Sequence, residues 1–226
     1  MKHRFALSRL AACAVVSSAL LSLPVRAEGP AGEPAEAFAR LEARLLAADS
    51  VSLEFHITAE GALAADLQGK LRVGTATPRP HNMLLSLWGE FAGQQVSAIL
   101  SATDTSMALG SGDELVGEPR SEHLAEAVLI GLTRMGLLHN LARLLADATP
   151  DHADGGVRDW VAVGDFATDS EEPAALSFAI TVAGTPAATA RLELDAAGLP
   201  HLRQQTVQFP GGEMRVTERY SAVAID

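Results

Sequence analysis

Histidine and acidic side chains, which bind most metal ions in proteins, occur in this sequence without the spacing that a metal site needs. No two histidines follow the H-x-x-x-H spacing of a metal-binding helix. Asp151 and Asp154 flank His152, but this group has too few ligands for a calcium loop. We therefore expect no metal ion and no cofactor. The histidines beyond the N-terminal region are His56, His81, His123, His139, His152 and His201.

The residues used in nucleophilic catalysis also occur outside their usual motifs. Gly110-Ser111-Gly112 lacks the G-x-S-x-G pattern of a nucleophile elbow. The chain contains neither a G-x-G-x-x-G segment nor a Walker loop. Lys70 is the only lysine after Lys2, and it falls on the polar side of a predicted strand, which argues against Schiff-base catalysis. We predict that the protein is not an enzyme.

Glu218 is the one charged residue that breaks the pattern of its segment. It shares a strand face with Met214, Val216 and Tyr220. A carboxylate on an apolar face is either paired with an arginine, exposed at a sheet edge, or uncharged with a raised pKa, which would suit acid–base chemistry. Because no second carboxylate is placed to work with Glu218, we favour pairing or exposure.

The N-terminal region has the layout of an export signal. Three basic residues precede the uncharged apolar run 10–23, and Ala27 ends a plausible cleavage site. Cys13 follows Leu-Ala-Ala as in a lipobox, but its apolar run comes after it, so lipid anchoring there is the less favoured alternative. We expect residues 1–27 to be removed, leaving a periplasmic protein with no cysteine and no transmembrane segment. Its 13 basic and 28 acidic residues give a net charge of −15, which argues against nucleic-acid binding.

Most of the remaining chain predicts β-strands. Apolar residues alternate with polar ones in 51–59 and again in 67–73. A hairpin joining these segments would place Phe55 opposite Leu71 and Glu54 opposite Arg72. Segment 83–91 is apolar on both faces, as a strand covered on each side would be. Further strands are predicted at 94–101, 105–109, 157–166, 174–182, 188–195, 202–209 and 213–225.

Two parts of the chain predict helices instead. Residues 34–48 carry an apolar stripe at helical spacing and start with a proline, which suits a first turn. Residues 121–148 predict two helices interrupted at Gly136. These mid-chain helices are apolar over more than half of their circumference, which indicates burial on more than one side.

This pattern resembles the LolA/LolB-like periplasmic lipoprotein carriers. Leu53-Glu-Phe55 with segment 69–73 looks like that family's first hairpin, and 217–226 looks like its closing strand. Pro78-Arg79-Pro80 lacks the aromatic residue that the carriers have after this motif, and Thr103-Asp-Thr105 replaces their Asp-Gly turn. The resemblance therefore concerns the fold more than membership of the lipoprotein shuttles.

The resemblance implies an α+β domain spanning residues 28–226. A strongly curved antiparallel sheet of about ten strands would form an incomplete barrel, with an N-terminal helix and a mid-chain helical lid. We expect a carrier or sensor that binds a lipid or an acylated protein non-covalently. A module of a cell-envelope complex, with a filled core and protein partners, is the alternative, because a lid and a plug have the same sequence pattern. The residues expected to line an apolar cavity are Phe55, Leu85, Leu87, Phe91, Leu100, Leu132, Met135 and Phe178.

Overall fold

The computed structural model describes residues 33–74, 82–111, 114–120, 124–139, 161–168, 175–209 and 212–226. The expected signal peptide, Cys13, the loop around His152 and most of the second mid-chain helix lie outside the described residues. None of the described helices is both long enough and apolar enough to cross a membrane.

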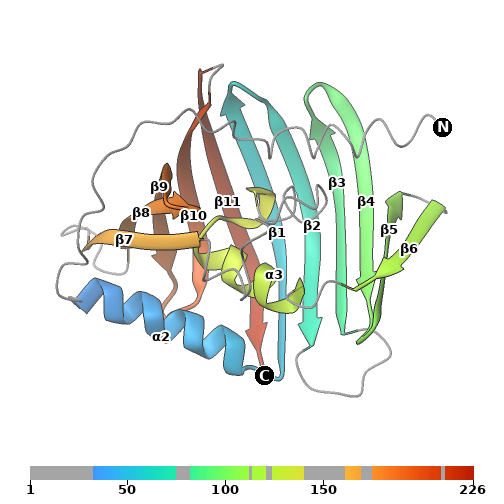
Figure 1. Ribbon diagram of the computed structural model, residues 1–226, viewed down its shortest axis with the longest axis horizontal. Helices are drawn as coiled ribbons and strands as arrows, with labels where there is room; N and C mark the ends of the chain where they lie inside the picture. The colour runs from blue at the N-terminus through green and yellow to red at the C-terminus, as the bar shows by residue number, and fades with distance from the viewer. Residues whose placement is uncertain are drawn as a thin grey trace.

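A single antiparallel sheet of eleven strands forms most of the described structure (Figure 1). Its strands run in the order β6-β5-β4-β3-β2-β1-β11-β10-β9-β8-β7. Two consecutive meanders therefore meet where β1 pairs with β11, and the sheet does not close. The strands are β1 (Ser50–Gly61), β2 (Ala65–Gly74), β3 (Met83–Phe91), β4 (Gln94–Ala102), β5 (Ser106–Ser111), β6 (Glu114–Pro119), β7 (Val161–Thr168), β8 (Ala175–Val182), β9 (Thr185–Leu194), β10 (Pro200–Phe209) and β11 (Gly212–Ile225).

Two helices lie on the same face of this sheet (Figure 1). Helix α2 (Glu33–Ala47) turns its apolar stripe of Phe38, Leu41 and Leu45 inward. Helix α3 (Leu124–Thr133) buries eight of its ten residues, as expected for a helix that is apolar on most sides. The predicted α+β architecture, with an open curved sheet, an N-terminal helix and a mid-chain helix, is confirmed.

The first hairpin has a different register from the predicted one. Glu54 lies opposite Lys70 rather than Arg72, and Phe55 lies opposite Gly69 rather than Leu71. The Lys70 ammonium donates to the Glu54 carboxylate at 2.6 Å. A shift of two residues keeps every side chain on its predicted face, so the alternating pattern alone could not detect it. Gly69 suits this register, because its missing side chain leaves room for the Phe55 ring.

Strand β3 is covered on one face only, which corrects the prediction of two covered faces. Leu85 and Leu87 are buried, whereas Leu84 and Trp88 on the other face are 47% and 44% exposed. The prediction failed because exposed apolar residues have the same pattern as buried ones. Strand β6 was not predicted at all, since its segment is short and mixes acidic residues with glycine and proline.

Candidate functional site

The sheet face that carries the helices presents continuous apolar rows across neighbouring strands. One row runs across five strands, from β1 to β5, and consists entirely of leucine. A second row places Phe55 beside Gly69, Leu87 and Ala98, so that large and small residues alternate. The leucine row consists of Leu53, Leu71, Leu85, Leu100 and Leu109.

All eight residues predicted to line a cavity belong to one buried apolar cluster, with exposed fractions between 1% and 6%. Four of them lie close together in the two rows, namely Phe55, Leu85, Leu87 and Leu100. Phe91 lies at the end of β3. Leu132 of α3 and Met135 of the following segment belong to what we call the helical cover, residues 124–138.

Phe178 lies apart from the leucine row, in the other half of the sheet. Its ring packs edge-on against Phe38 of α2, with the ring centres 4.9 Å apart, and it also contacts Phe166 of β7. The Arg203 guanidinium lies 5.6 Å from its ring centre, a cation–π distance. Phe178 therefore attaches α2 to the sheet.

Glu218 is 1% exposed and bonds to the chain segment that follows α3. Its carboxylate accepts hydrogen bonds from the backbone N–H groups of Leu137 and Leu138, at 2.8 and 2.9 Å, and from the Tyr220 hydroxyl. These amides begin a short helical turn, where backbone donors lack partners of their own. The carboxylate thus caps that turn from the sheet.

Arg203 lies directly opposite Glu218 on β10, and the two charges act on each other, but their side chains form no direct ion pair. Its guanidinium donates to the carbonyl oxygens of Thr133 and Arg134, at 2.5 and 2.6 Å, and to the Gln205 side chain. Burial lowers the pKa of Arg203, while Tyr220 and Glu218 act in the opposite direction. Burial also raises the pKa of the Tyr220 phenol well above its usual value, and the charge of Glu218 adds to this shift.

Gly136 passes between these two charged groups. Its φ of +79° is left-handed, a conformation that glycine adopts without penalty. A β-carbon at this position would lie 2.8 Å from a Glu218 carboxylate oxygen and 2.9 Å from Arg203 Nε. The glycine is therefore required by both its backbone conformation and its contacts. We call Glu218, Arg203 and Gly136 the clamp.

A buried ion pair attaches the same segment to α2. Arg134 donates from Nε and Nη2 to the two carboxylate oxygens of Glu42, at 2.7 and 2.9 Å, and also bonds the Val161 carbonyl of β7. The Thr133 hydroxyl donates to Glu42 as well. Both Glu42 and the Arg134 side chain are largely buried. Arg203 and Glu42 were not predicted from the sequence, although Arg203 shares a strand face with apolar Val207, the same signal that singled out Glu218.

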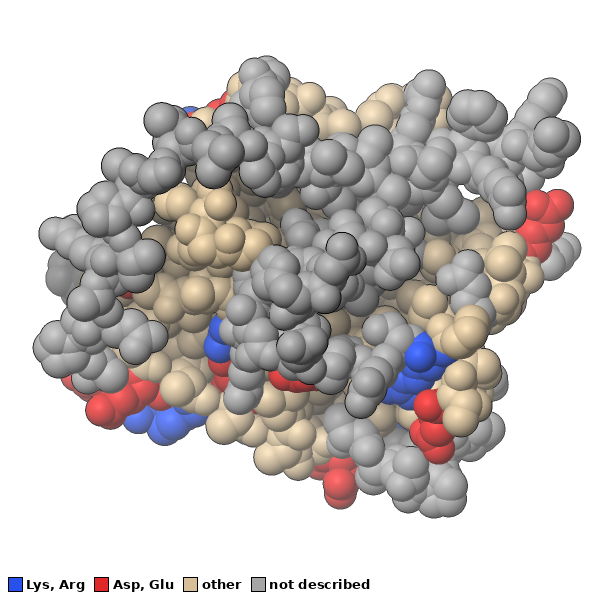
Figure 2. Space-filling view, viewed as in Figure 1, with Lys and Arg blue, Asp and Glu red and all other residues tan. Residues whose placement is uncertain are grey.

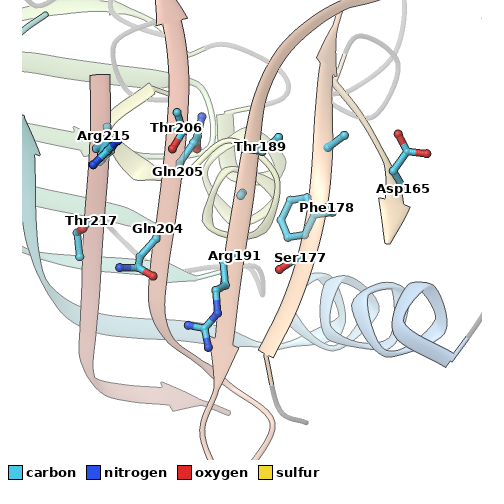
Figure 3. Close-up of a pocket in the computed structure, with 13 residues that line it drawn as sticks. Asp165, Ser177, Phe178, Thr189, Arg191, Gln204, Gln205, Thr206, Arg215 and Thr217 are labelled. Atoms are coloured by element: carbon cyan, nitrogen blue, oxygen red, sulfur yellow. The ribbon is translucent and has the colours of Figure 1, made fainter. Parts of the chain in front are cut away.

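The opposite face of the β8–β11 region holds an open groove of about 620 Å³ (Figure 3). Two cross-strand rows of mainly polar side chains line it. The two arginines in the groove bind acidic residues of their own strands, Arg191 with Glu193 and Arg215 with Glu213. This composition is typical of a solvated sheet face. The rows are Ser177, Arg191, Gln204 and Thr217, and Ala179, Thr189, Thr206 and Arg215.

Figure 2 shows the described charged side chains that are visible on the helix-bearing face mainly along its lower and right margins. Within the described ranges, no group of three or more histidine or acidic residues is placed to hold a metal ion.

Comparison with known proteins finds similarity at the level of structure only. No protein-family model and no curated protein matches the chain. Solved structures that it resembles include the Pseudomonas aeruginosa MucA/MucB complex (13% identity, TM-score 0.37, covering 86% of this chain and 57% of that one). A LolA superfamily protein from Nitrosomonas europaea matches with 11% identity and a TM-score of 0.39, covering 84% of this chain and 92% of that one. LprF from Mycobacterium bovis matches over the same shares, with 9% identity and a TM-score of 0.34.

These similarities concern the fold, and at such identities they transfer no function. The chain spans a little over half of the MucA/MucB chain that it matches. The architecture that the sequence resemblance implied, an open antiparallel sheet with helices on one face, is present in the described structure.

Proposed function

We propose that this protein is a non-catalytic periplasmic carrier or sensor that holds an apolar chain, such as the acyl chain of a lipid or lipoprotein, between the leucine row and the helical cover. The observation that supports this most is the contrast between the two ends of the cover. At residues 133–138 the cover is attached to strands and to α2 by charged groups. Helix α3 itself contributes apolar side chains to the interior.

Such an arrangement suits the entry of an apolar ligand. Apolar surfaces are held together by exclusion of water and have no directional bonds to break. An acyl chain can therefore take the place of the α3 side chains against the sheet at little cost. The charged attachments, by contrast, would leave buried groups unpaired if they separated. We therefore place the fixed end of the cover at the clamp and its opening end near Leu124.

The second row gives the ligand a place to lie. Ala98 is a small residue beside Leu87, in the half of the sheet where four of the predicted cavity residues gather. Filling that position with a larger side chain should obstruct an acyl chain there. Overpacking a buried position costs roughly 1–3 kcal/mol, which a stable domain can tolerate.

The test compares Ala98→Leu with Ala190→Leu. Ala190 is likewise a buried alanine on the helix-bearing face, but it lies on β9, away from the leucine row. Binding of cis-parinaric acid, followed by its fluorescence, should weaken at least about tenfold in Ala98→Leu and stay near wild type in Ala190→Leu. Equal weakening in both variants, or no binding to the wild-type protein, would favour the envelope module with a filled core.

A further inference from the structure

Among the described strands β6 is the last of the sheet, and its backbone pattern shows which groups face outward from it. The Arg120 N–H donates to the Thr105 carbonyl. Hydrogen-bonded pairs alternate along an antiparallel ladder, so residues 118, 116 and 114 also bond to β5. The N–H and C=O groups of Leu115 and Gly117 therefore point away from the sheet. Pro119, which has no N–H, occupies the next outward position, where proline is tolerated.

The same half of the sheet holds the exposed large apolar residues found among the described residues. Leu84, Trp88, Leu115 and Val116 are each between 44% and 59% exposed. Leu115 lies in a cross-strand row with Gly110, Ile99 and Ser86 on the face opposite the helices. Leu84 and Trp88 flank Ser86 on β3. On this face Leu84, Trp88, Ile99 and Leu115 form an apolar patch, interrupted by Ser86 and Gly110, from β3 to the edge at β6, whereas Val116 lies beside Leu109 on the helix-bearing face.

Gly117 leaves open space at that edge. A β-carbon built on it meets no atom within 4 Å. A large side chain from an added strand could cover this glycine and continue the apolar patch beyond Leu115. The edge therefore offers both outward backbone groups and a place for a side chain.

Charge indicates what kind of strand fits. If a second copy of β6 used the outward groups of both Leu115 and Gly117, antiparallel pairing would set Glu114 of each copy opposite position 118 of the other, also a glutamate. Like charges directly opposite each other destabilise a sheet. A cationic residue opposite Glu114 would instead be favourable, and the chain's net charge of −11 adds to that preference.

We propose that the β6 edge binds an extended segment of a partner protein by strand addition. The segment pairs its backbone with Leu115 and Gly117, places apolar side chains over the patch, and carries a cationic side chain opposite Glu114. Main-chain hydrogen bonds supply affinity in this mode of recognition, and the side chains supply selectivity. This surface is separate from the proposed acyl-chain site, so either can fail without the other.

The test uses the synthetic peptide Thr-Lys-Phe-Val-Val-Lys-Thr, which places valine opposite Leu115, phenylalanine opposite Gly117 and lysine opposite Glu114. Amide hydrogen exchange measured by NMR should slow at least about tenfold at Leu115 and Gly117. The Val116 amide should change little, because it already bonds to β5. Absence of this alternation at millimolar peptide would overturn the proposal.

Two substitutions at one position provide matched variants. Gly117→Pro removes an outward N–H without breaking a bond to β5, and should weaken peptide binding at least about tenfold. Gly117→Ala keeps the N–H and meets open space, so its binding should stay within about threefold of wild type. Equal binding by both variants would show non-specific charge attraction and overturn the proposal. Protection of the Leu115 and Gly117 amides that appears without peptide and rises with protein concentration would also overturn it, since it would indicate pairing with a second copy of the chain.

Discussion

At Gly136 the backbone lies against two buried charges of opposite sign, and this contact should be visible in stability. Gly136→Ala introduces a left-handed alanine, costing about 1–2 kcal/mol, and forces apart the two groups that its β-carbon would touch, costing roughly another 1–3 kcal/mol. Gly198 is a matched control, because its φ is +73° and a β-carbon there meets nothing within 4 Å. Denaturant unfolding should show a clearly larger loss for Gly136→Ala. Equal losses would mean that the clamp has room to relax.

Tyr220 gives the protein a pH dependence that can be assigned to one residue, because it is the only tyrosine in the chain. Burial and the neighbouring Glu218 raise its pKa in the folded state. Above about pH 10 the unfolded chain therefore loses a proton that the folded protein keeps, and stability falls by about 1.4 kcal/mol per pH unit until the folded pKa is reached.

The near-ultraviolet absorbance of phenolate follows this ionisation directly. We expect phenolate to appear only together with unfolding, and Tyr220→Phe to remove the tyrosine contribution to the alkaline slope. Phenolate formation near pH 10 in protein that is still folded would contradict the buried environment of Tyr220.

Among the elements, α3 and the segment after it should respond differently to a buried charge. Met135 lies next to Gly136, in the segment that Glu218 and Arg203 bind, and is 5% exposed. Leu124 begins α3 and is 1% exposed. An aspartate at Met135 cannot move away, so Met135→Asp should cost roughly 3–5 kcal/mol. If α3 opens at its start, Leu124→Asp should cost less than about 2 kcal/mol and abolish fatty-acid binding. Thermal melting and cis-parinaric acid fluorescence measure both effects, and equally large losses of stability would indicate a fixed plug.

The elements also show how far the sequence could be interpreted. Alternation and apolar runs located ten of the eleven described strands, because burial on one side imposes a period of two, but they gave the wrong covering for β3. It could not choose between registers two residues apart, as the Glu54–Lys70 pair shows. It also missed β6, whose leucine and valine are exposed on an edge rather than buried. The residues predicted to line a cavity are core positions, but the separation of Phe178 from the leucine row depends on curvature, which no local pattern encodes.

The clamp was only partly predictable for a similar reason. Glu218 stood out because a carboxylate on an apolar strand face needs a partner. Its cross-strand neighbour Arg203 becomes apparent only when the β10–β11 register is known, and Gly136 is separated from both by more than sixty residues of sequence. Long-range contacts of this kind are fixed by the topology of the whole sheet.

At the scale of the whole molecule, the chain consists of two meanders that are joined where β1 pairs with β11. Each meander could in principle form by pairing strands that follow one another, but the β1–β11 pairing connects residues near both ends of the described chain. The clamp adds to this junction, because Glu218 of β11 lies opposite Ile57 of β1 and caps the cover. We propose on these grounds that the two meanders form one cooperative domain.

Native-state hydrogen exchange followed by mass spectrometry tests that proposal. In a single cooperative domain the strands at the junction, β1 and β11, are paired on both sides and should open only with global unfolding. Strands β6 and β7 lie at the ends of the sheet and should exchange fastest. Protection should therefore fall outward from the junction in both directions. If β1 and β11 exchanged faster than β3 with β4 or β8 with β9, the meanders would open as separate units, and the proposal of one domain would be wrong.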